Sequence, residues 1–76
     1  MTNQEFAAAA AAYTDMVYRI ALNWFKNIPD AEDVTQNTML RLCRTDTAFE
    51  DGEHLRYWLV RVGVNECKRL SKSFWG

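Results

Sequence analysis

The sequence predicts an all-α fold, a compact three-helix bundle in which residues 1–76 form a single domain. Three segments joined by short polar connectors carry apolar residues at the spacing of about 3.6 that gathers them on one side of a helix. Glycine occurs three times and proline once, which argues against a fold rich in turns. A chain this short buries only about 60% of its unfolded surface, so we expect a thin margin of stability.

The first helix is expected to run from Thr2 to about Lys26. Thr2 and Glu5 match a capping box, in which each side chain satisfies a backbone N–H of the other residue. The alanine run 7–12 has the composition that most favours a helix. Beyond it, apolar residues at helical spacing predict a core side made of Tyr13, Met16, Val17, Ile20, Ala21, Trp24 and Phe25.

The second helix is expected over residues 30–44, with Asp30 as its N-cap directly after Pro29. Acids near its start and arginines near its end both suit the helix dipole. At 100° per residue, two sides separate. The core side holds Ala31, Val34, Thr35, Thr38, Met39 and Leu42. The polar side holds Asp33, Gln36, Asn37, Arg41 and Arg44.

Leu40 falls in the middle of this polar side. An apolar residue framed by the carboxylate of Asp33 and the amides of Gln36 and Asn37 is one pattern of a docking site for a partner. The other interpretation is a single exposed leucine, which is common on protein surfaces and needs no explanation.

The third helix is expected from about His54 to Lys72, after an acidic connector (residues 45–53) that Phe49 anchors to the core. Its core side holds Leu55, Leu59, Val62 and Leu70, with Trp58 at the edge. Glu66 also points toward this apolar side, which suggests that the helix ends or kinks there, as Gly63 would permit. Phe74 and Trp75 are expected either to pack on the first helix or to fray.

Charge is divided unevenly along the chain. The net charge is −1, but residues 30–53 sum to −5 and residues 54–76 to +4. Such a division indicates either two different partners or pairing between the two halves.

The sequence offers no chemistry for an enzyme. There is no glycine-rich phosphate loop, and the single histidine, His54, is expected as a surface residue with no nucleophile near it in sequence. We therefore expect no catalytic residue and no cofactor. Two cysteines without clustered histidines do not make a metal site, and Cys43 and Cys67 are expected as thiols that pack as small buried hydrophobes.

Targeting signals are also absent from the sequence. Every apolar run is interrupted by polar residues before it is long enough to span a membrane. The N-terminal MTNQEF lacks the positive charge and apolar core of a signal peptide, so we expect a cytoplasmic protein.

The polar side of the third helix interleaves aromatic and basic residues. Tyr57 and Trp58 share this side with Arg61 and Lys68, and Asn65 lies beside them. Cations track a phosphate backbone, and aromatic rings accept unstacked bases, so the pattern favours nucleic-acid binding. The alternative is an ordinary solvated face.

Two motifs in a fixed order carry a resemblance to a known family: DAEDVTQNTMLRL and, after the acidic connector, LRYWLVRVGVNECKRL. Together they resemble region 2 of the bacterial sigma factors of RNA polymerase, specifically the extracytoplasmic-function group of the sigma-70 family. The resemblance covers residues 13–70 and includes YTDMVYRIAL, which is typical of the family's first helix.

The resemblance implies a non-enzymatic module that recognises and melts the −10 promoter element in transcription initiation. It implies docking on the clamp helices of the polymerase β′ subunit through Asp33, Gln36, Asn37 and Leu40. The connector and the start of the third helix match the region that captures an unstacked base of the non-template strand. The residues that match the reading helix are Tyr57, Arg61, Asn65 and Lys68. An anti-sigma factor is a further partner that the resemblance implies.

The sequence also departs from the family pattern. Cys43 stands where an aromatic residue is frequent, and Asn37 stands where an acid is common. The helix-turn-helix that reads the −35 element is not found in these 76 residues, so we expect no initiation by this domain alone. The rival hypothesis is a small helical adaptor that binds only protein, without a DNA-reading role.

Overall fold

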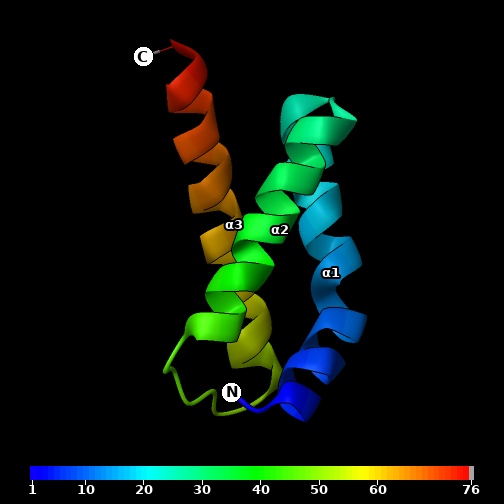
Figure 1. Cartoon of the computed structure of the whole chain (residues 1–76), viewed down its shortest axis with the longest axis vertical. Helices are drawn as coiled ribbons and strands as arrows, with labels where there is room; N and C mark the ends of the chain where they lie inside the picture. The colour runs from blue at the N-terminus through cyan, green and yellow to red at the C-terminus, as the bar shows by residue number, and fades with distance from the viewer. Residues whose placement is uncertain (76) are drawn as a thin grey trace.

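Residues 1–75 form three α-helices that run up, down and up (Figure 1). They are α1 (Asn3–Phe25), α2 (Ile28–Arg44) and α3 (Gly52–Trp75). This computed structural model describes the backbone of residues 1–75 and the side chains of residues 1–73. The predicted all-α three-helix fold is confirmed. The expectation for the side chains of Phe74 and Trp75 lies outside the described residues.

The capping box predicted for α1 is present. The Glu5 N–H donates to Thr2 Oγ1 at 3.1 Å, and the Thr2 N–H donates to Glu5 Oε1 at 2.9 Å. The hydrogen bond from the Thr2 backbone to the Glu5 carboxylate lowers the pKa of that side chain. At the other end, Lys26 adopts a left-handed conformation with φ of 56°, and its N–H donates to the Leu22 carbonyl at 2.8 Å. Both ends of α1 are therefore closed by local hydrogen bonds.

The prediction that Asp30 caps α2 is wrong. The N-cap is Asn27, whose Oδ1 accepts a hydrogen bond from the Asp30 N–H at 3.1 Å, so the helix begins at Ile28. Pro29 lies in the first turn, where a backbone N–H would have no acceptor within the helix, so the N–H that proline lacks is not needed. The helix ends at Arg44, as predicted.

The start of α3 also lies earlier than predicted. Asp51 Oδ1 accepts from the His54 N–H at 2.8 Å, and the first helical residue is Gly52 rather than His54. The helix then continues past Gly63 and Glu66 as far as Trp75. The expected end or kink near Glu66 is therefore wrong, and the position of this acid needs another explanation.

The core forms where α2 faces both other helices. All six residues of its predicted core side are buried: Ala31, Val34, Thr35, Thr38, Met39 and Leu42. From α1, Val17 and Ala21 are fully buried, and Ala9 shows that the alanine run also packs. From α3, Leu59, Val62 and Cys67 complete the interior, with Leu55 and Leu70 half-buried against it.

Two predicted core residues lie at the surface. Trp24 is 44% exposed, because its indole N–H reaches across to donate to Ser71 Oγ on α3 at 2.9 Å. An indole that makes this bond keeps its polar edge at the wet rim of the bundle. Cys43 is exposed, contrary to expectation, whereas Cys67 is buried, and both are free thiols. Burial, and then the neighbouring Glu66 charge, raises the pKa of the Cys67 thiol.

The core contains one hydroxyl whose hydrogen-bonding capacity is unused. Among the described side chains, Thr38 Oγ1 is buried without a hydrogen-bond partner. Thr35, one turn earlier, is also buried, but its hydroxyl donates to the Ala31 carbonyl at 2.7 Å. Thr38 faces Gly63 of α3, where an added Cβ would lie 4.0 Å from Oγ1. The α2–α3 contact therefore carries a desolvated polar atom at its centre.

We expect Thr38→Val to stabilise the domain by about 1 kcal/mol, because it replaces an unpaired buried hydroxyl by a methyl group of similar size. Thr35→Val is the matched control, since it removes a hydroxyl that is paired, and it should leave stability unchanged or lower. Urea unfolding followed by circular dichroism measures both. Equal effects of the two substitutions would show that the Thr38 hydroxyl is satisfied in solution.

Candidate functional site

The four residues predicted to dock on a partner form one stripe along α2, which we call the α2 stripe. It consists of Asp33, Gln36, Asn37 and Leu40. Asp33 and Gln36 are exposed, Asn37 is half-buried, and Leu40 is 43% exposed. None of the four uses its side chain in a hydrogen bond or ion pair with another described residue. The stripe is an apolar side chain surrounded by polar groups that are available to a partner.

The four residues predicted to read DNA form a second stripe, on α3, which we call the α3 stripe. It consists of Tyr57, Arg61, Asn65 and Lys68, all exposed. Tyr57 is 64% exposed, although its neighbours Trp58 and Leu59 turn inward. Within the described residues, neither Arg61 nor Lys68 has an ion-pair partner. The uncovered Tyr57 can offer a stacking surface, and Arg61, one turn further along α3, can offer a phosphate contact. Lys68 lies about three turns from Tyr57 and can supply a second phosphate contact.

The connector between α2 and α3 is held at its second half by aromatic packing. The half-buried Phe49 ring lies edge-on to His54 and to Trp58, with centroid distances of 5.2 and 5.5 Å. Phe49 and Trp58 both pack against the main core cluster, which agrees with the predicted anchor and with Trp58 at the core edge. The connector lies beside the N-terminal half of α1 (Figure 1). Near the middle of α1, Tyr13 Oη donates to the Gly52 carbonyl at 3.2 Å.

His54 has a structural role that the sequence did not indicate. It is half-buried rather than a plain surface residue, and its Nδ1 accepts a hydrogen bond from the Glu50 N–H at 3.1 Å. Together with the Asp51 cap, this bond fixes the last residues of the connector onto the first turn of α3. The aromatic residues at the start of α3 are thus set in place by local contacts.

Glu66 is the functional candidate that sequence reasoning missed. It is buried at 4% exposure, and both carboxylate oxygens are paired: Arg41 Nε lies 3.0 Å from Oε1, and Arg69 Nε lies 2.7 Å from Oε2. The two guanidinium groups explain how a charged residue occupies the inward side of α3. Arg69, three residues later, was the only signal in the sequence, because Arg41 reaches Glu66 from another helix.

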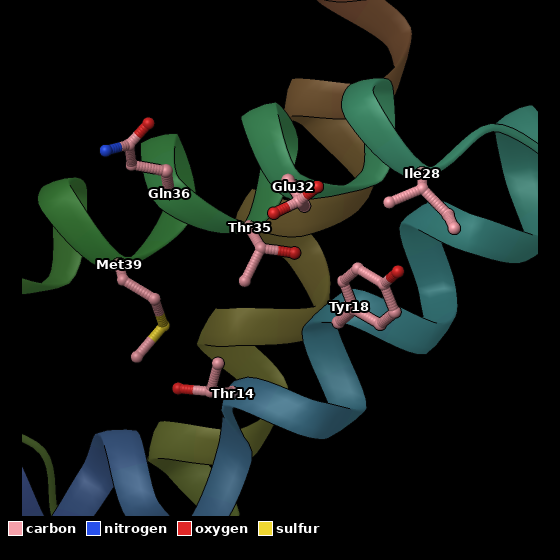
Figure 2. Close-up of a pocket in the computed structure, with 7 residues that line it drawn as sticks. All are labelled: Thr14, Tyr18, Ile28, Glu32, Thr35, Gln36 and Met39. Carbon is pink, nitrogen blue, oxygen red and sulfur yellow. The ribbon is translucent and has the colours of Figure 1, made fainter.

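Two grooves border these surfaces. The groove between α2 and α3 is lined by Asn37, Leu40, Arg41, Arg44, Thr45, Trp58, Glu66 and Arg69. The groove between α1 and α2 is lined by Thr14, Tyr18, Ile28, Glu32, Thr35, Gln36 and Met39. Figure 2 shows Thr14 and Tyr18 of α1 opposite Thr35 and Met39 of α2. The lining of this second groove has one charged side chain, Glu32, whereas the lining of the first has three arginines and Glu66.

The described residues hold no group of three His, Cys, Asp or Glu side chains that could bind a metal ion. None of the helices in residues 1–75 has both the length and the apolar character needed to cross a membrane.

The fold and its surfaces define a small helical module with a polar stripe on α2 and a basic stripe on α3. The model of the sigma-70 region 2 family matches residues 9–74, which is nearly the whole chain. The chain therefore belongs to the sigma-70 region 2 family. Members of this family are not enzymes; they serve RNA polymerase in promoter recognition at transcription initiation. No solved structure matches the chain.

Neighbouring residues of α3 should respond very differently to truncation. Leu59→Ala removes a fully buried side chain and should cost about 2–5 kcal/mol of stability. Tyr57→Ala removes a largely exposed one and should change stability by less than about 0.5 kcal/mol. Thermal unfolding of both variants measures the difference. A melting temperature lowered as much by Tyr57→Ala as by Leu59→Ala would place Tyr57 in the packing and not in a free binding surface.

Proposed function

We propose that this chain is region 2 of an extracytoplasmic-function sigma factor. In this role the α2 stripe docks on the clamp helices of the polymerase β′ subunit, and the α3 stripe holds the non-template strand of the −10 element. The observation that carries the proposal is that two sets of side chains lie on different helices of a sigma-70 region 2 fold. Seven of the eight side chains are exposed, and none pairs with another described residue.

Support for the docking role comes from the composition of the α2 stripe. Leu40 is a large apolar side chain that a partner can desolvate, and the surrounding amides and carboxylate can fix the orientation of that partner. A free carboxylate at Asp33 suits a basic residue of the partner. An anti-sigma factor that prevents initiation would compete for the same surface.

Support for the DNA-reading role comes from the α3 stripe and the end of the connector. Arg61 and Lys68 supply phosphate contacts, and Tyr57 offers a ring on which a base can stack. The Phe49–His54–Trp58 cluster stabilises the part of the connector that would receive the unstacked base. The charge of −5 in residues 30–53 opposes DNA, so the isolated domain should bind it weakly.

The first test concerns the α2 stripe. Leu40→Ala and Gln36→Ala should each weaken binding to a β′ clamp-helix fragment, by about 1 kcal/mol or more if they are interface anchors. Isothermal titration measures the affinity, and circular dichroism checks that helicity is retained. Asn23→Ala, which truncates an exposed amide side chain on α1, is the control and should bind normally. Unchanged affinity in both stripe variants would contradict the docking role.

The second test concerns the α3 stripe. With polymerase core present, the domain should prefer a single-stranded −10 oligonucleotide over the duplex, because bases in a duplex must first be unstacked and unpaired. Fluorescence anisotropy across a salt series measures the affinity. Arg61→Ala and Lys68→Ala should each lower the salt slope by about 0.7, the value for one phosphate contact on a single strand. Tyr57→Ala should lower affinity and leave the slope unchanged.

Arg19→Ala is the matched control, since it removes one positive charge from α1, away from both stripes. Equal binding of single strand and duplex, or no effect of the three α3 substitutions, would leave the protein-only adaptor as the better account. That adaptor would still bind the clamp-helix fragment through the α2 stripe.

A further inference from the structure

The groove between α2 and α3 concentrates positive charge, and we call it the arginine groove. Arg41 and Arg44 reach it from the last turns of α2, and Arg69 reaches it from α3. Glu66 is the only acid among its described lining residues, so the lining has a net charge of +2. An uncompensated charge in a groove favours a ligand of the opposite sign.

The arginines of this groove keep donors free for a ligand. Arg41 and Arg69 each use Nε to bind Glu66, yet their side chains are 58% and 59% exposed, which leaves their terminal amino groups accessible. Arg44 is exposed and has no ion-pair partner among the described residues. Because buried Glu66 fixes two of the guanidinium groups, part of the entropy cost of binding is already met in the free protein.

The groove also has an apolar part, which decides what kind of ligand fits. Leu40 is 43% exposed, and half-buried Trp58 lies at the opposite wall. A nucleic-acid strand can pair with the cations and stack a base on Trp58, but it makes no use of the aliphatic Leu40. An acidic segment of polypeptide uses both, since its carboxylates pair with guanidinium forks and its apolar side chains desolvate leucine and tryptophan.

We propose that the arginine groove binds an acidic, partly apolar segment of the RNA polymerase core. In the complex, carboxylates of this segment pair with Arg44 and Arg69, and an apolar side chain covers Leu40 and Trp58. The inference rests on the proposed function and deepens it, because Leu40 and Asn37 belong both to the α2 stripe and to the groove. Polymerase binding then continues from α2 across to α3.

The test uses the whole chain and polymerase core, with affinity measured by biolayer interferometry over a salt series. Arg44→Gln and Arg69→Gln should each weaken binding by about tenfold, as expected for the loss of a charge-assisted hydrogen bond. The loss should shrink as salt rises. Arg44→Lys should recover only part of the affinity, because lysine keeps the charge but not the fork. Circular dichroism confirms that each variant is folded.

Arg56→Gln is the matched control. Arg56 is an exposed arginine of α3 outside the groove, so its replacement removes the same charge and should leave polymerase affinity unchanged. If Arg56→Gln weakens binding as much as Arg69→Gln does, the effect is one of net charge and the proposal is overturned.

The remaining outcomes separate this inference from the proposed function. If Leu40→Ala weakens polymerase binding but the groove variants bind normally, the docking role stands and the acidic-segment proposal is overturned. If the groove variants lose affinity only for single-stranded promoter DNA, the groove is a phosphate contact and the proposal is again overturned. If neither Leu40→Ala nor the groove variants change polymerase binding, both the proposed docking role and this inference fail.

Discussion

The burial of one side of α2 against both other helices is the constraint on which the rest of the structure depends. One side of this helix packs against α1 and α3 through six buried residues, so its opposite side must face outward. The α2 stripe is therefore exposed because the opposite side of the helix is buried, and its own side chains make no contact that holds it outward. The same packing sets α3 beside α2 and so fixes the arginine groove between them.

Local patterns in the sequence were enough to predict most of the fold. The two sides of α2 follow from helical periodicity alone, because polar and apolar residues alternate there with a clear period, and every predicted core residue is buried. The capping box of α1 needs only two residues that are three positions apart in the chain. The start of α2 was missed because Asn27 and Asp30 are both residue types that suit an N-cap. The start of α3 was placed too late because Gly52 and Glu53 were assigned to the acidic connector.

The features that could not be predicted depend on partners far apart in sequence. Trp24 at the surface bonds to Ser71, and the buried Glu66 pairs with Arg41. A helical wheel shows one helix at a time and cannot predict such contacts between helices. For the candidate site, periodicity could place the members of each stripe on one side of one helix, and seven of the eight side chains are exposed. The binding roles given to the two stripes stay predictions. The arginine groove was not predicted, because its residues come from two helices and the sequence alone does not show which residues of α2 lie opposite which residues of α3.

The paired state of Glu66 has a consequence for how the chain tolerates mutation. The Glu66 carboxylate has two counter-ions, so a substitution of either Arg41 or Arg69 leaves the other arginine in contact with it. Losing the carboxylate instead leaves two guanidinium groups repelling each other at the α2–α3 boundary. Substitutions at this site should therefore affect stability unequally: loss of one arginine leaves one ion pair in place, whereas loss of Glu66 removes both.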